Sequence, residues 1–275
     1  MLAHEFEVDP RLVLAAYAQL ADENLVRVRP RSGVYVGPHA AVRGQHVGPP
    51  RRWLLDVLAQ GIAHDLTAEQ LAEHIREILG SARATVVECN TDQIHSMCHE
   101  LRRDYSVEAS GVELGELEAV ESEARLPLAI RRATLIVSAS HEPEVRRIAE
   151  LAGKPYVITR VRPELLARFG RLLLKGAVYF LVSDPRFAHK MRRLVAPMPG
   201  SANFHALVVG EDDLSVIPRG APTYLMRSAS ERLGNELPRG RLIPALRIFA
   251  PDTVREILTL VLAPSGRGAC GGGGR

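Results

Sequence analysis

From residue 84 onward, short apolar runs alternate with segments of helical periodicity, and this alternation constrains the fold most. The apolar runs fit strands at 84–89, 107–112, 133–138, 155–160, 177–183, 204–210, 222–226 and 242–249. Helical patterns lie between most of them, at 92–104, 116–130, 142–153, 163–174, 185–195 and 252–263. Buried strands that alternate with helices predict a mostly parallel α/β sheet. The strands could form one sheet or two lobes, and the break near 173–176 would suit a lobe boundary.

The chain of 275 residues is long enough for two domains, and we divide it into four segments. Residues 1–36 read as a compact motif, and the Gly- and Pro-rich stretch 37–52 as a linker. Residues 53–263 form the predicted α/β region, which opens with two helices. A capping box at Thr67-Ala68-Glu69-Gln70 would begin the second of these helices. The Gly-rich tail 264–275 is predicted to be disordered.

The N-terminal motif combines a short helix, a tight turn, a second helix and a basic hairpin. Asp9 is a good N-cap, and Pro10 suits the first position of the second helix. The helix ends near Glu23, and residues 25–29 and 34–36 then predict a two-stranded hairpin. Between residues 25 and 52 there are six arginines and no Asp or Glu, so positive charge is concentrated here.

The stretch LAHEFEVDPRLVLAAYAQLADENLVRVRPRSGVYV resembles the GntR-type winged-helix transcription regulators. The most specific parts are the LA…F.V turn, the V..A...L helix and the L-V-R-V-R…S-G-V-Y-V wing. The resemblance implies a dimer that binds double-stranded DNA, with the second helix in the major groove and the wing against the backbone. The family has a further helix before this stretch, so the resemblance is to an N-terminally truncated unit. A misassigned start, a deletion and cover from another segment are all open explanations.

The residues that match the DNA-contacting positions of this family lie on the second helix and on the wing. They are Arg11, Leu12, Leu14, Arg27, Arg29, Arg31, Ser32 and Gly33. The family has polar or basic residues where this chain has Pro10 and Leu14, so direct base recognition should be poor. The wing arginines should still supply salt-dependent affinity for the phosphates. The alternative is that this module makes only a dimer contact.

Small polar residues follow three of the predicted strands, where ligands collect in open α/β sheets. We therefore predict a binding site for a small polar or anionic effector, containing Asn90, Thr91, Ser138, Ser140, His141, Ser183 and Asp184. The alternative is that these residues only cap the helices that follow. From residue 84 on, the chain resembles, in architecture alone, the periplasmic-binding-protein-like effector domains of bacterial repressors.

No catalytic residues, cofactor or metal site are predicted. The chain lacks the glycine-rich nucleotide motifs, the G-x-S-x-G elbow and the H-E-x-x-H motif. Cys89 could act as a nucleophile with His141 as its base, but its apolar run favours a packed residue. His95, Cys98 and His99 share a helix face without an evident fourth metal ligand. Glu116, Glu118, Glu121 and Glu123 read as a solvated helix face.

The cysteine count and the hydropathy pattern bear on location. Three cysteines without paired spacing argue against a disulfide framework, and no segment has the length of a membrane span. The cytoplasm is the expected location, without a membrane partner. We expect a transcription regulator whose α/β region senses an effector. The alternatives are an α/β enzyme and a dimeric interaction protein whose degenerate winged helix does not bind DNA.

Overall fold

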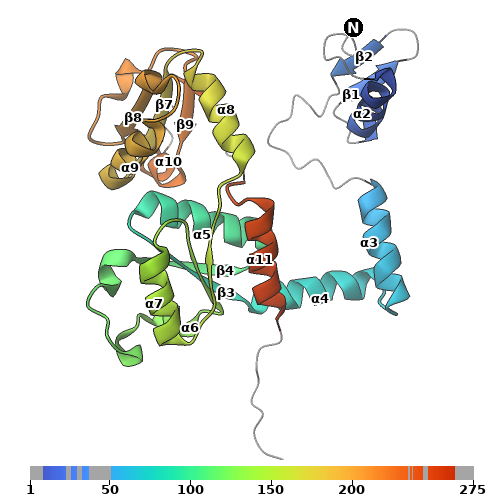
Figure 1. Ribbon diagram of the computed structural model, residues 1–275, viewed down its shortest axis with the longest axis horizontal. Coiled ribbons are helices and arrows are strands. Elements are labelled where there is room, and N and C mark those ends of the chain that lie inside the picture. Colours follow the sequence, from blue (N-terminus) through green and yellow to red (C-terminus); the bar gives the residue numbers. More distant parts are fainter. Residues whose placement is uncertain are drawn as a thin grey trace, which may run out of the picture. The chain divides into compact units, whose positions relative to one another are not determined.

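The computed structural model describes residues 9–22, 26–29, 33–36, 51–234, 236, 238–243 and 247–263 (Figure 1). The chain divides into two compact units, Met1–His74 and Ile75–Arg275. Among the described residues, no helix is long and apolar enough to cross a membrane. The two units are considered in turn.

The first unit contains one helix and a hairpin within the N-terminal motif. Helix α2 (Pro10–Asp22) follows Asp9, whose carboxylate accepts a hydrogen bond from the Arg11 amide at 2.8 Å. Strands β1 (Val26–Arg29) and β2 (Gly33–Val36) pair antiparallel. The predicted first helix, the wing tip with Arg31 and Ser32, the linker up to residue 50 and the tail lie outside the described residues.

Two helices lead toward the α/β region, α3 (Arg51–Ala63) and α4 (Ala68–Ser81). The predicted capping box at the start of α4 is confirmed. The Gln70 side chain accepts from the Thr67 amide at 2.8 Å, and the Thr67 hydroxyl accepts from the Gln70 amide at 3.1 Å. Helix α4 continues from the first unit into the second.

The second unit holds two four-stranded parallel sheets, so the predicted α/β class is confirmed and the two-lobe alternative is correct. The first sheet has the order β4-β3-β5-β6. Its strands are β3 (Arg83–Glu88), β4 (Glu108–Glu113), β5 (Leu135–Ser138) and β6 (Tyr156–Ile158). The helices that connect them are α5 (Thr91–Tyr105), α6 (Leu128–Arg132) and α7 (Glu142–Ala152).

The second sheet has the order β10-β9-β7-β8, which repeats the topology of the first. In both sheets the first strand lies between the second and the third. Its strands are β7 (Val178–Val182), β8 (Phe204–Val208), β9 (Pro222–Leu225) and β10 (Arg241–Leu242). The remaining helices are α8 (Pro163–Leu173), α9 (Pro185–Val195), α10 (Arg227–Leu233) and α11 (Pro251–Leu262).

Helices cover both faces of the first sheet. On one face, α5 and α11 pack over Ala84, Val86 and Leu135, and buried side chains such as Leu101 and Ile257 fill the interface. On the other face, α6 and α7 pack over the alternate strand residues. Because the side chains of a strand point alternately to opposite faces, a continuous apolar run is what a sheet covered on both sides requires.

The second sheet is covered in the same way, with α8 and α9 on one face and α10 on the other. Phe169 and Leu173 of α8 pack with Val178 and Val195. The predicted lobe boundary near 173–176 is therefore wrong, because α8 already belongs to the core of the second lobe. The boundary lies before α8.

The chain passes between the lobes twice, and the two passages lie side by side. Val161 and Phe249 form an antiparallel bridge, and the Ala250 amide donates to the Arg160 carbonyl at 2.8 Å. After the second passage, α11 packs on the first sheet. The first lobe thus consists of residues 75–159 and 248–263, because Ile248 and Phe249 pack in its core, and the second lobe consists of the segment between them.

Two predicted elements need correction, and one helix was missed. Residues 116–130 are not one helix. They contain the short 3-10 helices η1 (Leu114–Leu117) and η2 (Glu123–Arg125) and the start of α6. Residues 242–249 are not one strand, and α10 was not predicted. The other 3-10 helices are η3 (Ser201–Asn203) and η4 (Leu214–Val216).

Candidate functional site at the inter-lobe contact

The carboxyl ends of the first strands of both sheets meet between the lobes. Helix α5 begins directly after β3, and α9 begins directly after β7, so two helix N-termini lie at this contact (Figure 1). The third strands, β5 and β9, end beside them and lead into α7 and α10. In sheets of this order, ligands bind where the crossovers leave the first and third strands in opposite directions.

Asp92, in the first turn of α5, is fully buried and reaches across to the second lobe. Its carboxylate accepts from the Ser183 amide at 3.0 Å and from the Asp184 amide at 2.8 Å. The hydroxyls of Ser183 and Ser228 also donate to it. Four donors from the second lobe therefore compensate the burial of one carboxylate of the first lobe.

Asp184, the N-cap of α9, makes the reciprocal contact. Its carboxylate accepts from the Thr91 amide at the start of α5, at 3.1 Å, and from the Arg186 amide of its own helix at 2.9 Å. Each helix N-terminus thus receives a carboxylate of the opposite lobe, where the helix dipole favours negative charge. We call the contacts of Asp92 and Asp184 across the lobes the carboxylate clasp.

The guanidinium of Arg186 extends the clasp to the edge of the first sheet. It binds Asp184 at 2.7 Å and Glu113, at the end of β4, at 3.0 Å. Burial opposes ionisation of Asp184, but hydrogen bonds from the Arg186 side chain and from the amides of Thr91 and Arg186 outweigh it. The pKa of Asp184 is therefore lowered below its usual value.

Glu88, the last residue of β3, is a second fully buried carboxylate at this contact. It accepts from the Ser138 hydroxyl at 2.9 Å and from the Ala139 amide at 2.6 Å. The ammonium of Lys190, on α9 of the second lobe, lies 3.5 Å from its Oε2 atom. Lys190 also donates to Ser140 and to Gln93, both at 2.6 Å, so it ties the second lobe to three residues of the first.

Cys89 and His141 lie beside Glu88. One ligand-type atom from each of these three residues lies within 4.8 Å of the other two. The His141 Nε2 atom is buried, has no hydrogen-bond partner, and lies 3.6 Å from Glu88 Oε2. Cys89 is half-buried. Cys89 follows β3 and His141 follows β5, at the strand ends where the sequence places them.

The predicted effector residues all lie at the inter-lobe contact. Thr91, Ser183 and Asp184 take part in the carboxylate clasp, and Ser138 and Ser140 bind Glu88. Asn90 is buried and caps α5 by accepting from the Gln93 amide at 2.9 Å. The helix-cap interpretation therefore describes Asn90, whereas Asp184 both caps its helix and crosses to the other lobe.

Sequence reasoning missed the residues that hold the contact together. These are Glu88, Asp92, Gln93, Lys190 and Ser228. A Glu at the end of an otherwise apolar strand was the available signal for Glu88, because a buried carboxylate needs partners. Asp92 looks like an ordinary first-turn acid, and no sequence signal pairs it with serines roughly 90 and 136 residues away.

The three residues considered as a metal-binding helix face have different surroundings. Cys98 is buried, and burial raises the pKa of its thiol to about 11. His95 lies 3.7 Å from Glu231, and His99 lies 2.9 Å from Arg227. Within the described residues, the only cluster of metal-ligating types is that of Glu88, Cys89 and His141.

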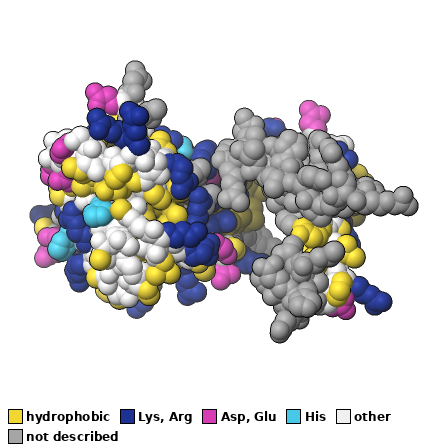
Figure 2. All heavy atoms as spheres, turned by 90° about the horizontal axis from the view of Figure 1, so that it is seen from above, with side chains coloured by type: hydrophobic (Ala, Val, Ile, Leu, Met, Phe, Trp, Pro, Cys, Tyr) yellow, Lys and Arg dark blue, Asp and Glu magenta, His cyan; other side chains and the backbone are white. Residues whose placement is uncertain are grey.

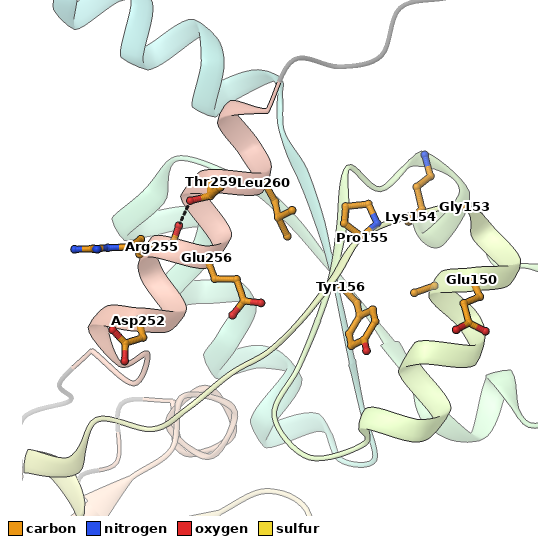
Figure 3. A pocket seen from close by; sticks show the side chains of 11 residues that line it. Glu150, Gly153, Lys154, Pro155, Tyr156, Asp252, Arg255, Glu256, Thr259 and Leu260 are labelled. Carbon is orange, nitrogen blue, oxygen red and sulfur yellow. Dashed lines mark hydrogen bonds between the residues drawn. The ribbon is translucent and has the colours of Figure 1, made fainter.

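A cavity of the described residues lies elsewhere, on the first lobe (Figure 3). It has a volume of about 710 Å³ and is lined by residues of α7, β6 and α11, with Glu256 of α11 and Tyr156 of β6 on its two sides. A second cavity of about 450 Å³ shares Tyr156 and Glu256. Neither is lined by a residue of the carboxylate clasp.

Comparison of the chain with protein-family models, with curated proteins and with solved structures gives no match. Charge gives no simpler answer. Figure 2 shows Lys and Arg side chains along the border of the α/β region as well as single ones elsewhere on that face. The two features of the chain that bear on its function are therefore the geometry of the inter-lobe contact and the basic N-terminal motif.

Proposed function

We propose that this protein is a DNA-binding transcription regulator whose α/β region senses a small polar or anionic effector between its lobes. One observation carries the proposal. The first and third strands of both sheets end at one contact, which is closed by hydrogen bonds between Asp92, Asp184 and the opposite lobe. Two lobes joined by paired crossovers and held by polar groups can open, and an effector can then replace those groups.

The effector class follows from the groups that the clasp would release. Opening frees the amides of Thr91, Ser183 and Asp184 at two helix N-termini. Such amides bind carboxylates and phosphates. An effector would have to supply an acceptor for these donors, because a buried amide without a partner costs about 1–3 kcal/mol. A carboxylate-bearing metabolite satisfies that requirement in the same way as Asp92 and Asp184.

DNA binding is assigned to the N-terminal motif on its arginines and its resemblance to winged-helix regulators. Leu12 and Leu14 of α2 are 64% and 66% exposed, and Arg11 is exposed next to them. This helix face offers one charged donor, so base recognition would be weak. Arg27 and Arg29 lie in β1 of the wing, and Gly33 begins β2, with Arg31 and Ser32 between the strands.

A homodimer is supported by the helices that follow the motif. On α3, Trp53, Leu55 and Ile62 are 54%, 66% and 65% exposed. Large apolar side chains at this density on one helix are typical of a surface that pairs with another protein. A second copy of the chain would bring two winged helices together, as two half-sites on DNA require.

The experiment is a mobility shift with DNA from upstream of the gene, measured over a range of salt concentrations. Arg29→Ala and Arg31→Ala should each weaken binding about equally on all sequences and lower the salt slope by about one. Arg219→Ala, in the second lobe, is the matched control and should leave the slope unchanged. No binding at low salt would refute the regulator and favour the dimeric interaction protein.

A further inference from the structure

We propose that Glu88, Cys89 and His141 form a binding site for a divalent transition-metal ion, for which Zn²⁺ is the probe. Metal binding itself does not depend on the proposed function. Its effect on lobe opening does, and that effect would make the metal a second regulatory ligand.

The geometry suits a small ion. The ligand-type atoms of the three residues lie within 4.8 Å of one another, and the His141 Nε2 and Glu88 Oε2 atoms are 3.6 Å apart. Tetrahedral Zn²⁺ with bonds of 2.0–2.3 Å requires ligand atoms separated by about 3.3–3.8 Å. The pair of Glu88 and His141 already meets this spacing, and a movement of about 1 Å by a side chain would bring the whole set within it.

His141 provides an independent observation. Its Nε2 atom is buried and has no hydrogen-bond partner, although Glu88 lies close to it. An unpaired buried nitrogen destabilises the fold, and a metal bond would give it a partner. His141 is positioned by the loop between β5 and α7, and Glu88 and Cys89 by the end of β3, so two neighbouring strands supply the three ligands.

The donor chemistry selects the kind of metal. A thiolate, an imidazole and a carboxylate together favour Zn²⁺ or a similar transition-metal ion over Mg²⁺ and Ca²⁺, which prefer oxygen ligands alone. Three protein ligands leave a fourth position open for water or for another ligand. The site is on the first lobe, at the inter-lobe contact, where the groups of the second lobe can reach that position.

Lys190 is the competing cation. Its ammonium lies 3.5 Å from the same Glu88 oxygen that faces His141, and it comes from α9 of the second lobe. A metal ion on that oxygen would repel the ammonium, because like charges at such distances disfavour each other by several kcal/mol at low dielectric. Metal binding would therefore weaken an ion pair that joins the lobes.

The test is metal binding by the full chain, first with Zn²⁺ in equilibrium dialysis and then with Co²⁺, whose absorption reports thiolate coordination. We expect one ion bound by the wild type, with affinity lowered about tenfold or more in Cys89→Ser and in His141→Ala. Cys98→Ala, His95→Ala and Cys270→Ser are the matched controls, and their affinities should equal that of the wild type. Circular dichroism of each variant establishes that it is folded.

A gain of affinity provides the second readout. Lys190→Gln removes the competing charge and should raise Zn²⁺ affinity about tenfold, which a purely structural role of the cluster would not produce. Zn²⁺ should also slow alkylation of Cys89 and leave that of Cys98 unchanged.

Absence of Zn²⁺ binding by the wild type, or equal binding by Cys89→Ser and His141→Ala, would overturn the proposal. These measurements use no DNA, so their failure is separate from a failure of the proposed regulator.

Discussion

The two lobes share a strand order but contribute different chemistry to their contact. The first lobe presents the two carboxylates that are fully buried there, Glu88 and Asp92. The second lobe presents mainly donors, from the Ser183 and Asp184 amides, two serine hydroxyls and Lys190. One topology thus gives an acceptor surface in one copy and a donor surface in the other. Complementarity of the lobes comes from the residues at the strand ends, and the fold only places them.

Asp184 is the exception that makes the contact reciprocal. It is an acceptor on the donor lobe, and it binds the amide of Thr91, the first residue of α5. The difference between Asp92 and Asp184 is therefore one of burial and partner number. Asp92 is 0% exposed with donors from the second lobe alone, whereas Asp184 is 6% exposed and also binds Arg186 of its own helix.

The largest expected effect is that of Asp92→Ala. The substitution leaves four donors of the second lobe without their acceptor, and we expect the free energy of unfolding to fall by about 3 kcal/mol or more. Urea denaturation followed by circular dichroism measures the loss. Asp213→Ala, at an exposed cap of η4, is the control and should cost about 1 kcal/mol or less. Equal losses would mean that the clasp does not stabilise the closed lobes.

Removal of one donor should have a smaller effect than removal of the acceptor. Ser228→Ala deletes a single hydroxyl from the Asp92 carboxylate, and we expect a loss of about 1 kcal/mol. In a double-mutant cycle, Ser228→Ala should cost little once Asp92 is Ala, because the two groups share one interaction. Additive losses would show that Ser228 acts independently of Asp92.

Acid should weaken the reciprocal half of the clasp. The pKa of Asp184 is lowered in the folded protein, so its stabilising contribution is present above the usual Asp value of about 3.9 and is lost as the pH falls through the lowered value. The stability difference between the wild type and Asp184→Asn should therefore shrink below about pH 4. Denaturation midpoints at a series of pH values measure it, and a constant difference would refute the assignment.

The smallest effect concerns the two described cysteines of the first lobe. Burial raises the pKa of Cys98 to about 11, so its thiol stays protonated and enclosed at neutral pH. Cys89 is half-buried at the inter-lobe contact. Iodoacetamide labelling with peptide mapping should modify Cys89 about tenfold faster than Cys98. Faster labelling of Cys98 would contradict the described burial.

Much of the fold could be predicted from the sequence because strands buried on both faces have an unambiguous pattern. The predicted end of β5 at Ser138 is correct, and the predicted end of β7 at Ser183 is one residue beyond the observed end at Val182. The prediction of one helix over 116–130 was wrong because the glutamates of this segment also fit the exposed surface of a helix. In the structure, Ser122 and Pro127 are the N-caps of two separate short helices, η2 and α6.

The sequence predicted which strand ends form the candidate site, but not which residues bind one another there. The parallel strands of one sheet end at the same edge, where ligands collect. The positions of Ser138 and Ser183 after their strands therefore sufficed to predict that each lies at such an edge. Partners across the lobes could not be assigned, since Asp92 and Ser228 are brought together by two passages of the chain between lobes. For the same reason, Lys190 could not be predicted as a partner of Glu88.

The return of α11 to the first lobe has a consequence for how the chain is made. During synthesis, the continuous segment that forms the second lobe emerges before Pro251, whereas the first sheet still lacks its last helix. Apolar residues such as Val86 and Leu135 are covered on one face by α5 alone until Ile257 and Val261 leave the ribosome. A chain that stops before Pro251 therefore holds a complete second lobe and an unfinished first one.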